Sequence, residues 1–106
     1  SFVKGMAGEA ALVAAMRAAG APAAVTTSGS MLSALRHLGL TRVATVTPYT
    51  TDLTVGLTSY LMEAGIEVVA TAGLGMTSRI WAVPYETTAE LVHATDVPDA
   101  QAIVIS

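Results

Sequence analysis

The residue best placed for chemistry in this sequence is Tyr49, which follows Pro48 at the end of a strand-like run. Thr50 and Thr51 come next and can cap a helix, whose unpaired N–H groups favour an anion. A phenol at this point could donate a hydrogen bond to a carboxylate or to an enolate-like oxygen. The alternative is that Tyr49 packs over the edge of a sheet and that Thr50 only caps the helix.

Two further segments have part of the pattern of a ligand-binding loop. Residues 72–76 read Ala-Gly-Leu-Gly-Met and are followed by Thr77 and Ser78. Two glycines at this spacing lack the third glycine of a dinucleotide fingerprint, so glycines of tight turns are favoured. Residues 27–30 read Thr-Ser-Gly-Ser, but no lysine follows them as in a phosphate loop, so helix capping is favoured.

The other chemistry-bearing side chains are scattered. His37 stands near the end of an expected helix, where a cation suits the helix dipole, and His93 has no acidic or histidine neighbour at coordination spacing. The sequence has no cysteine, and neither a Ser/His/Asp set nor a pair of carboxylates stands out. We therefore expect no metal site and no complete catalytic set within these residues.

The composition excludes several classes of protein. Of the 106 residues, 53% are hydrophobic and only 12% are charged, against about 25% charged in a typical domain. This excludes intrinsic disorder, and a net charge of −3 without a basic cluster excludes a nucleic-acid module. The longest uncharged stretch contains Gly20, Pro22 and Gly29, which argues against a membrane span. The absence of cysteine favours the cytoplasm, and so few charges predict that much of the surface is buried against another chain or another part of the polypeptide.

The spacing of apolar residues predicts alternating helices and strands. Glycines 20, 39 and 65 stand where helices are expected to end, and residues 87–90 have capping-box spacing. The predicted helices cover residues 8–19, 27–38, 51–64 and 87–95, and the predicted strands cover residues 23–26, 42–47, 66–71 and 100–106.

This order predicts an α/β fold in three layers, a parallel sheet with helices on both faces. The carboxyl ends of parallel strands then share one edge, where ligands bind. The predicted strand order places three segments at this ligand-binding edge: residues 47–51, residues 72–78 and whatever follows Ser106. Because the chain stops at the end of a strand and starts in what reads as a loop, we expect an internal fragment of a longer protein.

Two stretches, residues 35–49 and 66–75, resemble the maleate cis-trans isomerase and arylmalonate decarboxylase group of the Asp/Glu racemase superfamily. Ser1-Phe-Val-Lys-Gly5 resembles the segment just after that family's first catalytic position. Ala102-Ile-Val-Ile-Ser106 resembles the strand that leads into the second, a cysteine. The resemblance therefore implies that the catalytic cysteine positions lie before Ser1 and after Ser106, and that residues 1–106 alone are inactive.

The resemblance also implies two similar α/β lobes with the active site between them. Residues 1–21 would form a helix belonging to or bridging from the first lobe, and residues 22–106 the second lobe, truncated at its C-terminal end. Such enzymes need no metal or organic cofactor and act on a small dicarboxylate. The low charge content also leads us to expect a homo-oligomer. Tyr49 matches the family tyrosine that binds a substrate carboxylate, and it is the one residue that carries over. We expect the hydroxyls of Thr47, Thr50 and Ser78 to support it as substrate-binding groups.

Several activities stay open at this point. The resemblance leans towards a maleate cis-trans isomerase, with an arylmalonate decarboxylase or an Asp/Glu racemase as alternatives. The family's isomerases carry an asparagine after the second strand, whereas this chain has Thr77 and Ser78 there. A non-catalytic, flavodoxin-like binding domain is the alternative from another class.

Overall fold

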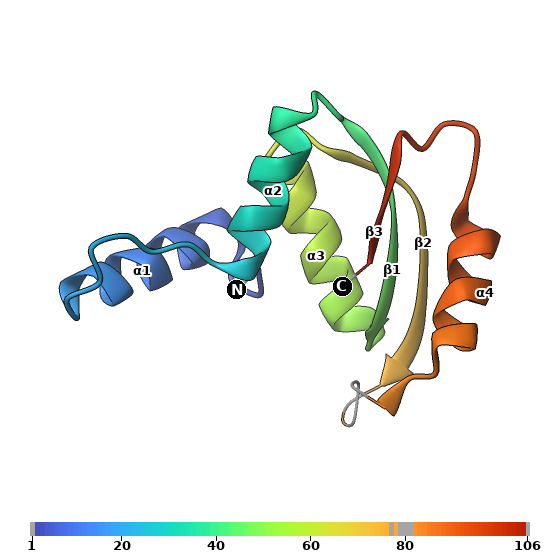
Figure 1. The fold of residues 1–106 in the computed structure, drawn as a ribbon, viewed down its shortest axis with the longest axis horizontal. Coiled ribbons are helices and arrows are strands. Elements are labelled where there is room, and N and C mark those ends of the chain that lie inside the picture. Colours follow the sequence, from blue (N-terminus) through green and yellow to red (C-terminus); the bar gives the residue numbers. More distant parts are fainter. Residues whose placement is uncertain (1, 77, 79–81, 106) are drawn as a thin grey trace.

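The computed structural model describes residues 2–76, 78 and 82–105. Four helices and three strands alternate along this part of the chain (Figure 1). In order they are α1 (Gly5–Ala18), α2 (Thr27–His37), β1 (Arg42–Tyr49), α3 (Thr51–Glu63), β2 (Glu67–Met76), α4 (Tyr85–Thr95) and β3 (Ala102–Ile105).

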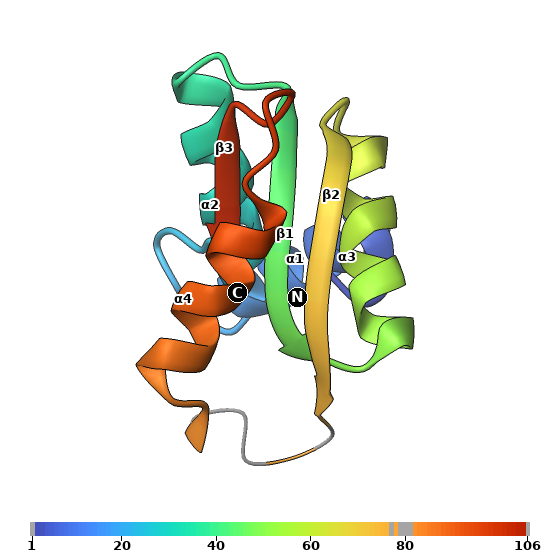
Figure 2. The same cartoon turned by 90° about the vertical axis from the view of Figure 1, so that its right-hand side faces the viewer.

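The three strands form one parallel sheet in the order β2-β1-β3. Helices α2 and α3 cover one face of this sheet and α4 covers the other (Figures 1 and 2). The α/β fold in three layers is therefore confirmed. All three strands point the same way, so their carboxyl ends share one edge.

The central strand β1 is buried on both faces. Val43, Ala44, Thr45, Val46 and Thr47 are each at most 2% exposed, as expected for a parallel strand covered by helices on both sides. Their threonine hydroxyls are paired, and that of Thr45 donates to the hydroxyl of Thr71 on β2 at 2.8 Å. Pairing removes most of the cost of burying a polar group, so β1 tolerates threonines at its centre.

The main core lies between the sheet and helices α2 and α3. Leu57, Tyr60 and Leu61 of α3 are each at most 2% exposed, and Leu32 and Leu35 of α2 pack in the same cluster. Full burial of one such side chain contributes roughly 1.5–3 kcal/mol. Helix α3 therefore anchors the segment that leads from β1 into the helix.

The end of each of the first three helices is where the sequence predicts it. Gly20, Gly39 and Gly65 follow α1, α2 and α3 with φ of 111°, 69° and 83°. A positive φ disfavours residues with a Cβ, so glycine is the residue that can end a helix in this way.

Three predicted elements differ from the structure. Residues 23–26 form no strand, and Thr26 instead caps α2 by accepting from the Gly29 N–H at 2.9 Å, one residue before the predicted cap. Strand β2 runs on to Met76, through the segment predicted to be a glycine loop. Helix α4 starts at Tyr85 after Pro84, so the capping box predicted at residues 87–90 is wrong. Pro84 stands at the start of α4, where a backbone N–H has no partner within the helix. Proline is therefore well suited to this position, and the helix begins without a capping box.

Helix α1 extends away from the sheet (Figure 1) and has no buried residue. Two carboxylates connect it to the rest of the chain. Glu63 of α3 accepts from the backbone N–H of Met6 at 2.9 Å, and Glu9 accepts from the Thr26 hydroxyl at 3.1 Å. An anion at a helix N-terminus is favourable, so Glu63 fixes the start of α1. The assignment of residues 1–21 to a first lobe stays a prediction.

None of the helices in the described residues is long and apolar enough to cross a membrane.

Tyr60 is fully buried, and its hydroxyl has no hydrogen-bond partner among the described residues. We expect Tyr60→Phe to stabilise the fold by about 1 kcal/mol, because an unsatisfied buried hydroxyl costs about that much. Burial and then the Glu9 carboxylate raise the pKa of Tyr60 above 10.0, and Arg36 opposes them. The Tyr60 hydroxyl thus ionises more easily in the unfolded chain than in the folded chain. The stability that comes from keeping Tyr60 neutral is therefore complete below pH 10 and is lost as the pH rises above it.

Urea unfolding at pH 7 and at pH 10.5 checks both points. The substituted chain should be the more stable at pH 7 and should lose less stability at the higher pH. A destabilised Tyr60→Phe chain would mean that the hydroxyl has a partner in solution.

Candidate functional site

Tyr49 is the last residue of β1 and lies at the carboxyl edge of the sheet. It pairs with Met76 of β2 after a register shift between Thr47 and Tyr49. The shift breaks the regular ladder at the point where the strand leaves the sheet. The side chain of Tyr49 is half-buried, and the residue lines two cavities.

Helix α3 begins immediately after Tyr49. The Thr50 side chain accepts a hydrogen bond from the Leu53 N–H at 3.4 Å and so caps this helix, as the sequence predicts. Thr47 is 1% exposed, and its hydroxyl lies 3.0 Å from the hydroxyl of Thr54. The Thr47 hydroxyl therefore connects the end of β1 to the first turn of α3 and helps to hold the two elements together at the carboxyl edge of the sheet.

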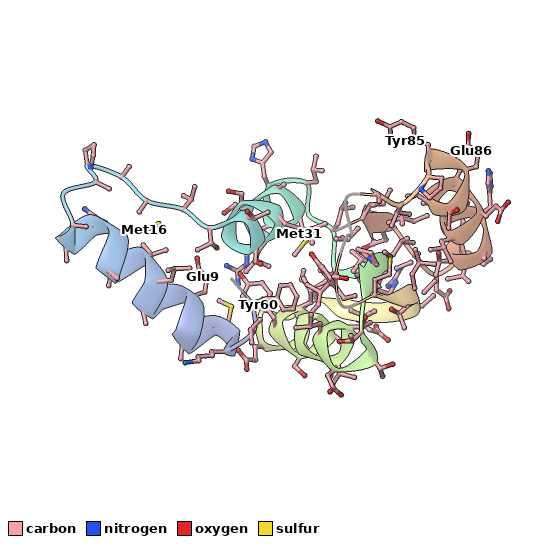
Figure 3. All side chains as sticks on the ribbon, turned by 90° about the horizontal axis from the view of Figure 1, so that it is seen from below. Glu9, Met16, Met31, Tyr60, Tyr85 and Glu86 are labelled. Carbon is pink, nitrogen blue, oxygen red and sulfur yellow. The ribbon has the colours of Figure 1, made fainter. Side chains whose placement is uncertain are left out.

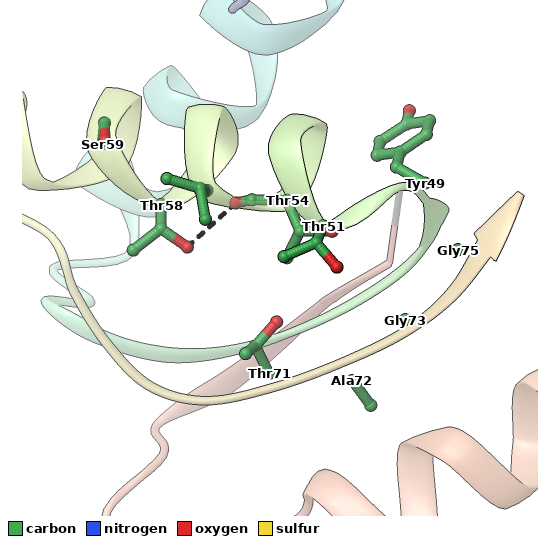
Figure 4. A pocket seen from close by; sticks show the side chains of 10 residues that line it. Tyr49, Thr51, Thr54, Thr58, Ser59, Thr71, Ala72, Gly73 and Gly75 are labelled. Carbon is green, nitrogen blue, oxygen red and sulfur yellow. Dashed lines mark hydrogen bonds between the residues drawn. The ribbon is translucent and has the colours of Figure 1, made fainter. Parts of the chain in front are cut away.

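One cavity of about 340 Å³ lies between α3 and β2. Figure 4 shows its hydroxyl groups in a row along α3, with Tyr49 at one end and Thr71 of β2 opposite. None of its lining residues carries a formal charge at neutral pH. These residues are Tyr49, Thr51, Thr54, Val55, Thr58, Ser59, Thr71, Ala72, Gly73 and Gly75.

A second cavity, of about 500 Å³, lies on the α2 and β3 side of Tyr49. Its other walls are largely apolar and include Leu35, Leu57 and Ile105. A smaller cavity of about 290 Å³ lies on the α4 side of the sheet and is lined by Pro48, Leu74, Ile105 and further apolar side chains. The edge thus offers hydroxyls on one side of Tyr49 and apolar surface on the other.

Phe2 contacts Tyr49 from the start of the chain. The two ring centroids are 5.9 Å apart, with 47° between the planes, and Phe2 is only 8% exposed. Such tilted ring pairs are favourable beyond the area they bury. Three distant parts of the sequence therefore meet at one end of the carboxyl edge, through Phe2, Tyr49 and Ile105.

The glycine segment contributes close packing to the site. A Cβ at Gly73 would lie 3.3 Å from the Thr47 carbonyl oxygen and 3.4 Å from its hydroxyl, so a side chain there would press on the strand. Gly75 has a φ of 67°, which favours glycine. Both residues belong to β2, and Gly73 and Gly75 line the cavity shown in Figure 4.

Of the four predicted site residues, Thr47, Tyr49 and Thr50 lie together at the end of β1. Ser78 is exposed on a bend beyond β2 and lines none of the cavities described above. Thr77 lies outside the described residues. Within the described part of the chain, no cluster of histidine, aspartate and glutamate could hold a metal ion.

Three further residues lie beside the predicted site and were not expected there: Phe2, Thr54 and Leu57. Thr54 lies seven residues after Thr47, a spacing that reaches across a strand end and one helical turn and could have indicated a pair. Phe2 gave no such indication, because it lies 47 positions before Tyr49 in the sequence.

The whole chain, residues 1–106, matches the family described as arylmalonate decarboxylase. Arylmalonate decarboxylase of Bordetella bronchiseptica is 35% identical over 111 residues, which cover 100% of this chain and 46% of that protein. A crystal structure of an arylmalonate decarboxylase superposes with a TM-score of 0.84 at 34% identity, over 99% of this chain and 46% of that one.

An isomerase has the same fold. Nocardia farcinica maleate cis-trans isomerase, solved as a mutant with a covalently bound succinylcysteine intermediate, gives a TM-score of 0.81 at 26% identity, over 97% of this chain and 45% of that one. The chain thus spans about half the length of the relatives it matches. These matches confirm the resemblance to the Asp/Glu racemase-like group, and the chain belongs to the arylmalonate decarboxylase family.

Proposed function

We propose that this chain forms one side of the active site of a cofactor-independent enzyme that acts on a small dicarboxylate. The remainder of that polypeptide supplies the other lobe and the cysteine that the reaction needs. An apolar-substituted malonate is the preferred substrate class, and decarboxylation is the preferred reaction.

The meeting of Phe2, Tyr49 and Ile105 carries this proposal. Phe2 belongs to the segment that resembles the one after the family's first catalytic position, and Ile105 to the strand that resembles the one leading to the second. Both approach Tyr49, which shares a ring contact with Phe2 and a cavity with Ile105. A substrate bound at Tyr49 would thus lie between the two catalytic positions.

The chemistry of the edge suits a carboxylate held without a cation. The Tyr49 hydroxyl can donate to a carboxylate oxygen, and the backbone N–H groups at the start of α3 favour a negative charge. When carbon dioxide departs, its bonding electron pair stays on the substrate, which becomes an enediolate. Neutral hydrogen-bond donors can bind the negative charge of this enediolate without a metal. A cysteine thiol then protonates the α-carbon, so that one carbon dioxide leaves and one proton replaces it.

The apolar walls beside Tyr49 favour a substituted malonate over maleate. The cavity of about 500 Å³ that Tyr49 lines is walled chiefly by aliphatic side chains, which suit an aryl or alkyl substituent that maleate lacks. For maleate, the cysteine thiolate would add to the double bond, the resulting single bond would rotate, and elimination would give the trans diacid. The same Tyr49 donor serves both reactions.

A binding experiment on the 106-residue chain tests the proposal. Titration with phenylmalonate should shift the NMR signals of the Tyr49 ring and of the Thr51 and Asp52 amides, and maleate should cause smaller shifts at the ring. The dimethyl ester of phenylmalonate, which has no charge, is the control and should leave the amides unchanged. Equal shifts with the ester, or none with either diacid, would contradict a carboxylate site and favour a non-catalytic binding domain.

A further inference from the structure

Tyr49 lies in a short turn between β1 and α3, and a pair of threonine hydroxyls closes this turn. Thr47 precedes Tyr49 by two residues, and Thr54 follows it by five. The two hydroxyl oxygens are 3.0 Å apart, so one hydroxyl donates to the other. A side-chain hydrogen bond therefore joins the two ends of the segment that carries Tyr49.

The regular ladder of the sheet ends just before Tyr49. Thr47 pairs with Gly73 of β2, and the register shifts between Thr47 and Tyr49. The residue between them is Pro48, which has no N–H to donate to a neighbouring strand. Contacts outside the regular ladder must therefore help to set the direction of the chain at Tyr49.

Thr54 is a well-fixed partner for this hydrogen bond, because the start of α3 holds its backbone. The Thr54 N–H donates to the Thr50 carbonyl at 3.0 Å, and the Thr54 carbonyl accepts from the Thr58 hydroxyl at 3.1 Å. Figure 4 shows Thr54 and Thr58 on α3 and Tyr49 at the end of β1. The bond to Thr47 therefore links the end of the strand directly to the helix.

Strand β2 closes the space beside the hydroxyl pair. A Cβ at Gly73 would lie 3.3 Å from the Thr47 carbonyl oxygen, 3.4 Å from the Thr47 hydroxyl and 3.6 Å from the Thr54 hydroxyl. Thr47 is only 1% exposed. Because its hydroxyl is buried and already bonded to Thr54, Thr47 is not available to a substrate, and its role differs from the direct binding expected from the sequence.

We propose that the hydroxyl pair of Thr47 and Thr54 positions Tyr49, and that Thr47 does not itself bind the substrate. The role of the pair rests on the proposed function, in which the Tyr49 hydroxyl donates to the reacting carboxylate. Such a donor works only in the correct place, and a misplacement of about 1 Å can lower a rate by about 100-fold. Thr47 and Thr54 are thus positioning residues that act through Tyr49.

Thr54→Val tests this role in the protein that carries this chain together with the other lobe. Valine keeps the shape of threonine and removes only the hydroxyl, so the bond to Thr47 is lost while the backbone bonds of α3 remain. For a substituted malonate, kcat should fall by about 10- to 100-fold, and by more than KM rises. Thr54→Ser keeps the hydroxyl and should restore kcat.

A cycle of double substitutions distinguishes positioning from a purely structural role. In the Tyr49→Phe background, Thr54→Val should lower kcat by less than about twofold, because the hydroxyl that the pair positions is absent. Thr47→Val should lower kcat as Thr54→Val does, and the two together should lower it no further, since each breaks the same bond. Additive effects of Thr54→Val and Tyr49→Phe would overturn the proposal, because Thr54 would then act independently of Tyr49.

The ring NMR signals of Tyr49, identified by their loss in Tyr49→Phe, measure its position without any need for activity. They should shift in Thr54→Val and in Thr47→Val and should stay in place in Thr54→Ser. If Tyr49→Phe leaves kcat unchanged, the proposed function fails, and the ring signals alone decide whether the pair positions Tyr49. If Tyr49→Phe lowers kcat and Thr54→Val does not, only the role of the hydroxyl pair is overturned.

Thr87→Val is the matched control, because Thr87 is a half-buried threonine in the first turn of α4. Figure 3 marks this turn by Tyr85 and Glu86, and α4 covers the face of the sheet opposite to α3 (Figure 2). The substitution should change neither kcat nor the Tyr49 ring signals, and a loss of kcat equal to that of Thr54→Val would overturn the proposal. Circular dichroism checks that each variant is folded. If Thr54→Val is not, Thr54→Ala removes the same hydroxyl without adding a methyl group and takes its place.

Discussion

Tyr49→Phe is expected to lower kcat on a substituted malonate by about 100- to 1,000-fold, which is the effect of removing one donor to a developing oxyanion. The protein to assay is the one that carries this chain together with the other lobe. The hydroxyl binds charge that grows as carbon dioxide leaves, so kcat should fall more than KM rises. Steady-state kinetics of carbon dioxide release measure both quantities.

The substitution removes only the hydroxyl, so folding should be little changed. The phenylalanine ring can keep the contact with Phe2, whose centroid lies 5.9 Å from that of Tyr49. Tyr85→Phe is the matched control, because Tyr85 is 91% exposed at the start of α4 and should not affect kcat. If Tyr49→Phe and Tyr85→Phe have equal activity, Tyr49 does not bind the reacting group.

The parts of the fold that depend on local chemistry could be predicted from the sequence. Thr50 caps α3 and Gly65 follows its end, as expected, because a cap needs only a side-chain oxygen and a positive φ needs only the absence of a Cβ. Strand β1 was predicted from its run of β-forming residues, which is near-continuously apolar as a strand covered on both faces requires. The shared carboxyl edge follows from the parallel order.

The parts that depend on distant contacts could not be predicted. Strand β2 continues through Gly73 because that glycine lies against the Thr47 carbonyl oxygen, a contact that the local sequence does not reveal. The place of Phe2 beside Tyr49 and the pairing of the Thr47 and Thr54 hydroxyls also depend on how α3 docks. The sequence thus predicted Tyr49 as a site residue but did not predict the neighbours that orient it.

Leu61 is one of three buried side chains through which α3 packs in the core, with Leu57 and Tyr60. Leu61 is fully buried in the core cluster, and Leu61→Ala should destabilise the chain by about 2–5 kcal/mol, the cost of lost burial together with a cavity. The backbone of this turn is unaffected, because the Leu61 carbonyl still accepts from the Ile66 N–H, a bond of 2.9 Å. The loss therefore reports side-chain packing alone, and urea unfolding at fixed protein concentration measures it.

Met62→Ala is the matched control, because Met62 is the next residue of α3 and is 64% exposed. Its effect should be within about 0.5 kcal/mol. Since a domain is stable by only about 5–15 kcal/mol, Leu61→Ala removes much of the free energy that holds α3, and with it Tyr49, against the sheet. Equal effects of the two substitutions would mean that α3 does not dock through Leu61, and the position of Tyr49 would then need another explanation.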